Sequence, residues 1–389
     1  MTLVRWILVI LLFAIVAACL AITIVPRFLD RVYYRGPVSD HFDGQRFFNP
    51  GHDDTVAPPT GNSRGGFLWR YITNRDKRPE WPKQVPVTPG KPPARVEGEA
   101  MTVTWVGHAS VLVQTQGLNI LTDPVWSENA GPFGLGPKRV TEPGVRFDDL
   151  PRIDLVLVSH NHYDHMDLAT LKRLWERDKP LIVTSLGNDA VIGEAGVPAE
   201  ALDWGGRVTV KPGVDVVVTR SHHWSSRWFT DRNRALWSGF AVTMPGGNLF
   251  YSGDTGAGDL SWVDEARALG PIRLALLPIG AFRFVPGQMA IGSHIGPVDA
   301  VEIFERLGAA RAIPVHWGTF RLSYEAYDTP PRLLDATMKC AGLDPQRFAP
   351  VTIGAPVSVP PYAPPPAGPA IDRAALLKCL DTPAVRALK

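Results

Sequence analysis

The feature that most restricts the fold of this chain is an apolar run followed directly by a dense group of ionisable side chains. Leu155 to Val158 is apolar, and the six residues from His160 to His165 contain three histidines and an aspartate. A buried strand that ends in polar residues is typical of a site at the carboxyl end of a sheet. His160 and His162 are two positions apart, so in an extended chain both side chains face one way and can bind one ion.

A metal ion explains this group better than ordinary polar burial does. A single histidine at a strand end is more often a satisfied polar residue than a ligand. Several buried histidines, however, repel one another when charged, and their burial is unfavourable unless a cation neutralises the group. Imidazole and carboxylate are common ligands of first-row divalent ions. Asp167 follows the group and is placed to cap a helix whose apolar face is formed by Leu168, Leu171 and Leu174.

Other ionisable residues also follow apolar runs later in the chain. Val214 to Arg220 leads to His222 and His223, and strand-like segments also precede Asp254 and His316. Because each of these residues follows a predicted strand, we expect the side chains to meet on one rim of a sheet assembly. The pattern by itself does not decide which of the two adjacent histidines takes part.

The chain resembles the metallo-β-lactamase fold hydrolases, and within them the N-acylphosphatidylethanolamine-hydrolysing phospholipase D branch. The His-x-His-x-Asp-His signature of these hydrolases matches His160 to His165. The resemblance covers roughly residues 40 to 355 and includes six further motifs in the same order: Trp105 to Ser110, Leu121 to Pro124, Gly136 to Arg139, Ser252 to Gly256, Pro278 to Ala281 and Val315 to Phe320.

This resemblance implies an α/β fold, a four-layer αββα sandwich, with a site for two divalent metal ions. Zinc is the first choice of metal, and manganese or iron are alternatives. The implied ligands are His160, His162 and His223 for one ion, Asp164, His165 and His316 for the other, and Asp254 for both. His223 is preferred over His222 because the family has histidine directly before tryptophan.

Three further residues are expected near the metals by the same resemblance. His294 matches a family histidine near the substrate, so Asp164, Asp254 and His294 are the predicted catalytic residues. His108 and Asp123 match supporting positions that do not bind metal, and either could fix the tautomer of a ligand.

The resemblance also implies the reaction, which is hydrolysis of a phosphodiester in an N-acylated phospholipid to phosphatidic acid and an N-acylethanolamine. Two alternatives stay open. The fold also hosts lactonases that act on small soluble substrates, and fold alone does not separate these activities. A non-catalytic metal-binding module of a membrane complex is the other alternative, although the complete ligand set argues against it.

The N-terminal segment predicts a membrane anchor. Trp6 to Val25 is a run of 20 residues without a charge, long enough to cross a bilayer. A cleaved signal peptide is a competing interpretation, as is lipidation of Cys19 in a lipobox-like Val16 to Cys19, but the run continues beyond Cys19 and lacks an Ala-x-Ala site. We expect a single anchor in a bacterial inner membrane. Arginines after the run favour a cytoplasmic catalytic domain, although they could instead contact anionic lipid headgroups.

The predicted organisation has four parts: a membrane anchor at 1–35, an irregular arm at 36–98, the hydrolase domain at 99–355, and a proline-rich linker with a weak C-terminal helix at 356–389. Phe42, Phe47 and Phe48 are expected to pin the arm to the domain, although such an arm could also line a lipid entrance. The stretch from Pro356 to Pro369 is expected to be an extended linker.

Composition narrows the possible partners. The formal net charge is +2 and no dense basic patch with interleaved aromatic residues is present, so nucleic acid binding is not expected. The expected partners are a membrane lipid substrate and the bilayer, and the oligomeric state is not predicted. The three cysteines, at positions 19, 340 and 379, are interpreted as too few and too scattered for a disulfide framework or a thiolate metal site.

Overall fold

Two mixed β-sheets form the centre of the protein in its computed structural model, which describes residues 2–28, 31–52, 56–58, 63–228, 230–366 and 370–388. The strand order is β13-β1-β2-β3-β4-β5-β6 in one sheet and β12-β11-β10-β9-β8-β7 in the other. The strands of the first sheet are β1 (Met101–Gly107), β2 (Ser110–Thr115), β3 (Leu118–Thr122), β4 (Leu155–Val158), β5 (Leu181–Ser185), β6 (Glu200–Leu202) and β13 (Pro356–Val359). Those of the second are β7 (Arg207–Lys211), β8 (Val214–Thr219), β9 (Gly239–Thr243), β10 (Asn248–Tyr251), β11 (Ile272–Pro278) and β12 (Arg311–Val315).

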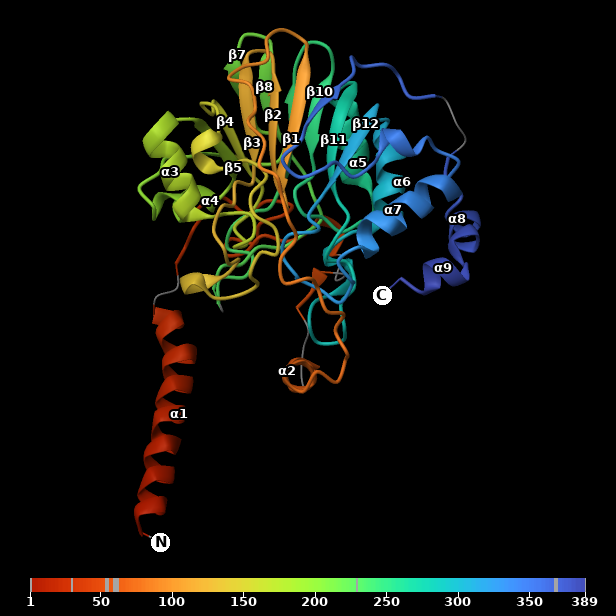
Figure 1. The fold of residues 1–389 in the computed structure, drawn as a ribbon. Coiled ribbons are helices and arrows are strands. Elements are labelled where there is room, and N and C mark those ends of the chain that lie inside the picture. Colours follow the sequence, from red (N-terminus) through yellow and green to blue (C-terminus); the bar gives the residue numbers. More distant parts are fainter. Residues whose placement is uncertain are drawn as a thin grey trace.

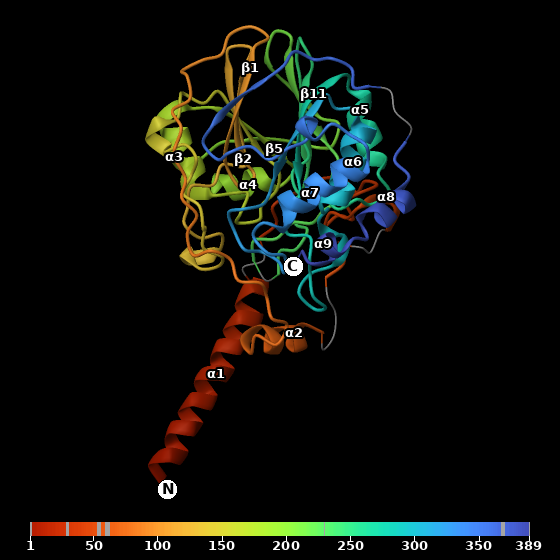
Figure 2. The ribbon, with the colours of Figure 1, turned by 45° about the vertical axis from the view of Figure 1, so that its right-hand side comes forward.

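Helices cover the outer face of each sheet, so the layers run helix, sheet, sheet, helix (Figures 1 and 2). The first sheet is covered by α3 (Leu168–Asp178) and α4 (Asn188–Gly193), and the second by α5 (Ser261–Ala268), α6 (Pro297–Leu307) and α7 (Thr329–Cys340). Short 3₁₀ turns are η1 (Pro50–His52), η3 (Pro132–Gly134), η4 (Phe147–Asp149), η5 (Ile291–Ser293) and η6 (Pro345–Arg347). This arrangement agrees with the predicted α/β sandwich.

The core between the sheets explains why the strands are so apolar. Val111, Leu157, Val216 and Phe240 come from both sheets and are completely buried in one cluster. Every residue of β4 is buried, because one face of its sheet packs on the other sheet and the opposite face packs on α3 and α4. A continuous apolar run, rather than alternation, is the pattern that this position requires.

The helix that follows the histidine group begins as the sequence predicts. The side chain of Asp167 accepts hydrogen bonds from the backbone N–H groups of Ala169 and Thr170, which caps α3. Leu171 and Leu174 are fully buried against the first sheet. The cap fixes where the chain turns from the site into the covering layer.

The N-terminal segment forms a long helix, α1 (Thr2–Phe28). Residues Leu3–Ile24 are long and apolar enough to cross a membrane by length and composition, and their side chains are all exposed. The domain core therefore does not bury this surface.

The arm at 36–98 differs from its prediction in one element. Phe42 and Phe47 are each 1% exposed and pack beside Trp237, so these two rings hold the arm against the domain. The expectation of little regular structure was wrong at α2 (Ser63–Ile72). Two glycines lower the helix propensity of this segment, and its helix is held in part by a tertiary hydrogen bond from Arg70 to the carbonyl of Pro286 (2.6 Å).

The C-terminal region was also predicted incorrectly in two respects. The start of the expected linker is strand β13, in which Val357 pairs with Val103 of β1; residues 367–369 lie outside the described part. The expected single helix is two, α8 (Arg373–Leu380) and α9 (Pro383–Arg386). The proline content led us to expect a linker. A strand forms here because prolines are tolerated at a sheet edge, and β13 pairs with β1 at that edge.

The interpretation of the cysteines was wrong as well. Cys340, at the end of α7, forms a disulfide with Cys379 of α8, and their Cα atoms are 5.8 Å apart. Their separation in sequence hid this pairing, since only the packing of α8 onto α7 brings them together. Leu376, Leu380 and Leu388 are buried at the same contact.

Candidate metal centre

The predicted ligands lie at one end of the sandwich, where loops follow the strands. These loops fill the lower end of the domain in Figure 1, which is also the end from which α1 and α2 project. The residues come from the segments after β4, β8, β10 and β12. All seven predicted ligands are therefore brought to one place from distant parts of the chain.

The first group of possible ligands contains His160, His162, His223 and Asp254, whose ligand atoms lie within 4.8 Å of one another. Nε2 of His160 is 2.8 Å from Nδ1 of His162, which is 3.4 Å from Nε2 of His223. The three imidazoles that the sequence assigned to one ion thus meet at one point.

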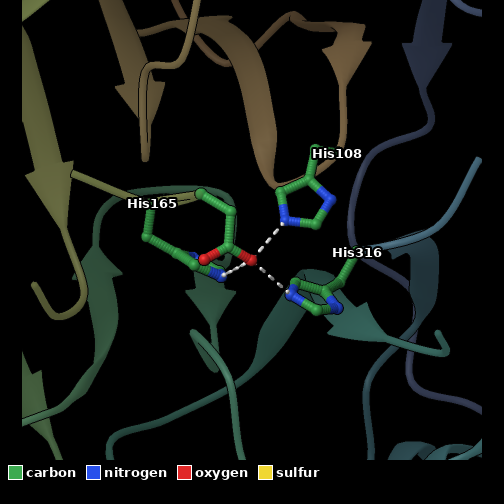
Figure 3. A group of neighbouring side chains, drawn as sticks. His108, His165 and His316 are labelled. Atoms are coloured by element: carbon green, nitrogen blue, oxygen red, sulfur yellow. Dashed lines mark hydrogen bonds and ion pairs between the residues drawn. The ribbon is translucent and has the colours of Figure 1, made fainter. Parts of the chain in front are cut away.

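The second group contains His108, Asp164, His165 and His316. Oδ2 of Asp164 lies 3.0 Å from Nε2 of His108, 3.5 Å from that of His165 and 3.3 Å from that of His316. Figure 3 shows the three rings directed toward this carboxylate. His108 was predicted to lie near the site as a supporting residue, and it contacts the same carboxylate as the two predicted ligands.

Asp254 lies between the two groups. Its Oδ2 is 3.1 Å from Nε2 of both His165 and His316, and 3.9 Å from Nε2 of His223. Only 2% of the Asp254 side chain is exposed. A carboxylate in this position can serve both groups at once, because it has two oxygens that accept.

Burial and mutual repulsion keep the first three histidines neutral. Burial holds the pKa values of His160, His162 and His223 well below the usual histidine range, and neighbouring histidines lower each of them further. A neutral imidazole is the form that binds a metal ion.

The second group carries paired charges instead. Burial alone would raise the pKa values of Asp164 and Asp254, but the adjacent histidines, His165 foremost, hold both well below the usual range. Conversely, burial would lower the pKa of His316, but Asp254 and Asp164 raise it to about 9. The carboxylates of Asp164 and Asp254 are therefore anionic. The positively charged groups beside them lie where a metal cation can bind instead.

Hydrogen bonds outside the cluster decide which nitrogen each histidine presents. Nδ1 of His223 is 2.8 Å from the carbonyl oxygen of Ser293, and Nδ1 of His165 is 2.6 Å from Oδ2 of Asp123. Both partners accept, so Nδ1 carries a proton in each ring, and Nε2 is the nitrogen that can bind a metal ion once it carries no proton. Neither carboxylate oxygen of Asp254 accepts a well-directed hydrogen bond within the described part of the chain, although two ring nitrogens lie 3.1 Å from its Oδ2. These donor atoms fit a pair of divalent metal ions.

Asp123 has the supporting position that the sequence predicted. Its Oδ1 accepts from the backbone N–H of Ser159 at 2.7 Å, and its Oδ2 accepts from the hydroxyl groups of Ser159 and Tyr251. The contribution of Tyr251, which comes from β10, was missed because no local pattern marks a strand tyrosine as a partner of a distant aspartate.

His294 lies at the edge of the cluster. Its Nδ1 is 3.7 Å from Oδ2 of Asp254, and its ring centroid is 5.1 Å from that of His316. Burial lowers its pKa to about 4, so the ring is neutral at neutral pH. The backbone N–H of His222 donates to Oγ1 of Thr255, the residue after Asp254, so His222 is a neighbour of the cluster.

The sequence matches the family model of the beta-lactamase superfamily domain over residues 118–317. The chain belongs to this superfamily. It is 35% identical to N-acyl-phosphatidylethanolamine-hydrolyzing phospholipase D 1 of Caenorhabditis elegans over 240 residues, which cover 59% of this chain and 67% of that protein. It is 34% identical to a UPF0173 metal-dependent hydrolase of Nitratidesulfovibrio vulgaris over 226 residues, covering 56% of this chain and 80% of that protein.

The fold of this superfamily member is similar to that of Igni18, a metallo hydrolase of Ignicoccus hospitalis. The TM-score is 0.51 at 20% sequence identity, and the match covers 67% of this chain and 98% of Igni18. The predicted family is therefore confirmed, and the protein is a hydrolytic enzyme of the metal-dependent class.

Proposed function

We propose that the protein is a membrane-anchored phosphodiesterase with two divalent metal ions, most simply zinc, that cleaves N-acylphosphatidylethanolamine-like lipids as a phospholipase D does. The observation that carries the proposal is the pair of ligand groups sharing Asp254. The 35% identity to a phospholipase D of that specificity supports the choice of substrate.

In this proposal, each of the two groups of predicted ligands binds one metal ion. His160, His162 and His223 would hold one ion, Asp164, His165 and His316 the other, and Asp254 both. When bound, such ions supply the Lewis acidity that activates water and polarises a phosphoryl oxygen. Hydrolysis then adds water across the phosphodiester, which gives phosphatidic acid and an N-acylethanolamine.

The protein's own groups orient the reactants in this proposal. His294 is neutral and lies beside Asp254, so its imidazole can donate a hydrogen bond to a phosphoryl oxygen and position the phosphodiester. Asp123 and the Ser293 carbonyl keep the ligand rings of His165 and His223 from rotating. We assign His294 to substrate positioning, and Asp164 and Asp254 to holding the metals that do the chemistry.

The apolar helix α1 favours a lipid substrate over a small soluble one. A bilayer would cover the exposed apolar surface of Leu3–Ile24, and a phospholipid resides in that bilayer. A soluble lactone would give no reason for such an anchor.

A substrate panel tests the proposal. The full-length protein in detergent with added zinc is offered a diacyl N-acylphosphatidylethanolamine, a soluble phosphodiester and a lactone, with His162→Ala as the metal-site control. Release of N-acylethanolamine by the wild-type protein and its loss in the variant are expected. Cleavage of the lactone alone would overturn the lipid phosphodiesterase proposal.

We also propose that the catalytic domain faces away from the cytoplasm, against the expectation from the arginines. The Cys340–Cys379 disulfide supports this side of the membrane, because structural disulfides persist in oxidising compartments and are rare in the cytosol. Arg35 is exposed and can then contact anionic headgroups, which was the alternative interpretation of this charge, whereas Arg31 pairs with Glu194.

A further inference from the structure

Three arginines near the metal centre come together from separate parts of the chain. Arg232 belongs to the loop between β8 and β9, Arg46 to the N-terminal arm and Arg64 to α2. Burial lowers the pKa of Arg232 to about 10, and the positive charges of Arg64 and Arg46 lower it further. Among the residues that the structure describes, no carboxylate forms an ion pair with any of the three. Positive charge without an acidic partner attracts an anionic ligand.

A single aromatic side chain connects Arg232 to the predicted ligands. The guanidinium carbon of Arg232 lies 4.0 Å from the centroid of the Trp224 ring. The Trp224 ring meets the ring of His162, a predicted ligand, with 4.2 Å between centroids. The guanidinium and the His162 imidazole are therefore neighbours of the same ring.

The first group of ligands is open to solvent on this side. His162 is partly exposed, whereas the other three members of its group are buried. Trp224 and Arg232 are also partly exposed. A substrate that reaches this group therefore approaches it past His162, where the Arg232 guanidinium is within reach.

The N-terminal arm fixes the position of Arg232. Nη2 of Arg232 donates to the carbonyl of Val56 at 2.5 Å. Arg46 donates to the carbonyl of Arg232 and, at 3.1 Å, to the carbonyl of Thr230. Because the guanidinium is already ordered by these contacts and by the Trp224 ring, it loses little conformational freedom when it binds a further group.

The remaining donors of Arg232 suit an oxyanion. Stacking on the face of a tryptophan leaves the N–H groups at the edge of a guanidinium free to donate. Their planar arrangement matches a carboxylate or a phosphate, either of which can accept parallel hydrogen bonds from one arginine. The ligand that this site favours therefore carries a negative charge.

We propose that Arg232, with Arg46 and Arg64 adding positive charge, binds an anionic group of the substrate other than the phosphate that is cleaved. This inference rests on the proposed function and specifies its substrate class, a phospholipid whose N-acylated head group carries a carboxylate, as in N-acylated phosphatidylserine. The carboxylate of that head group is only a few bonds from the phosphorus, so one head group can contact the metal centre and Arg232 together. An ethanolamine head group has no such carboxylate.

Kinetics with matched lipids test this anion site. The full-length protein with added zinc, in uncharged detergent micelles, is offered N-acylphosphatidylserine and N-acylphosphatidylethanolamine with identical acyl chains. Arg232→Gln should lower kcat/KM for the serine lipid by about tenfold or more, mainly through KM, and change that for the ethanolamine lipid by less than ~twofold. Arg232→Lys keeps the charge but not the planar donors, so it should restore part of the preference.

Arg152→Gln is the matched control. Arg152 is exposed and precedes β4, whereas the predicted ligands follow that strand, so this variant should change neither value. An equal loss on both lipids in Arg232→Gln would show that Arg232 acts on the cleaved phosphodiester or on the fold, which overturns the proposal.

A binding measurement separates the anion site from the reaction. Calorimetry compares O-phosphoserine with O-phosphoethanolamine, which differ by a carboxylate, in wild-type and Arg232→Gln proteins of equal metal content and circular dichroism. Tighter binding of O-phosphoserine by the wild type, abolished in Arg232→Gln, supports the anion site even if no lipid is cleaved and the proposed function fails. Cleavage of the ethanolamine lipid together with equal binding of both compounds overturns the anion site and leaves the proposed function standing.

Discussion

Oδ2 of Asp254 lies 3.1 Å from Nε2 of His316, although the two residues follow different strands, β10 and β12. The same oxygen is equally close to Nε2 of His165. One buried carboxylate thus connects the segment after β4 with two strand ends of the second sheet, and it lies close to both groups of possible ligands.

Replacing Asp254 by asparagine should remove the second metal ion and lower activity by at least ~100-fold, because a neutral amide neither bridges two cations nor balances their charge. Metal content by mass spectrometry and turnover are measured together. Asp259→Asn, on the exposed side of the same loop, is the control and should change neither. If the Asp254→Asn variant still bound two metal ions, the Asp254 carboxylate would not be needed to hold both.

Replacing Asp123 by asparagine should weaken metal binding by about 10- to 100-fold while leaving all seven ligands in place, because Asp123 orients the His165 ring through Nδ1. Competition with a metal chelator gives the affinity, and circular dichroism checks that the fold persists. An unchanged metal affinity would mean that Ser159 and Tyr251 suffice to hold this region.

The attachment of the N-terminal arm should weaken as the pH rises. The His41 ring lies 2.6 Å from Oδ1 of Asp40, 2.8 Å from Oδ1 of Asp203, and stacks on Trp204. Burial lowers the pKa of His41, but the two carboxylates outweigh it and raise the pKa above 6.5. The pairing therefore contributes its full stability below about pH 6.5 and loses it as the pH rises through the raised pKa.

Hydrogen-exchange protection of residues 41–48, corrected for intrinsic exchange, measures this effect between about pH 6 and pH 9. His41→Gln should flatten the pH dependence. The same decline in the variant would assign it to another group.

Removing the disulfide should loosen the C-terminal helices without affecting the metal centre. For a sequence separation of 39 residues, the Cys340→Ala/Cys379→Ala variant should lose roughly 3–4 kcal/mol of stabilisation of the docked α8. Limited proteolysis of residues 371–388 reports this loss, and activity should stay unchanged because no predicted site residue lies in α8. Equal protease resistance would show that Leu376 and Leu380 hold the helix without the bond.

The side of the membrane is tested by fusing alkaline phosphatase, which requires disulfides to fold, or green fluorescent protein to the C-terminus of the full chain. A domain outside the cytoplasm predicts phosphatase activity and no fluorescence in a bacterial host. The opposite pattern would restore the cytoplasmic placement that the arginines suggested.

The sequence by itself determined the elements whose signals are local. The apolar run before His160 and the cap at Asp167 both follow from short patterns that neighbouring residues complete. The family motifs then indicated the seven candidate ligands. The position of these ligands after predicted strands agreed with that assignment.

Only the tertiary structure decided the features that join distant segments. The hydrogen bond from Tyr251 to Asp123, the contact of His108 with Asp164, the pairing of β13 with β1 and the Cys340–Cys379 disulfide all depend on how separate segments pack. Helix α2 belongs to this class too, since its own sequence is a weak helix former held by a contact at Pro286. Local patterns fix backbone conformation, whereas side-chain partners far apart in sequence are chosen only when the two sheets close on one another.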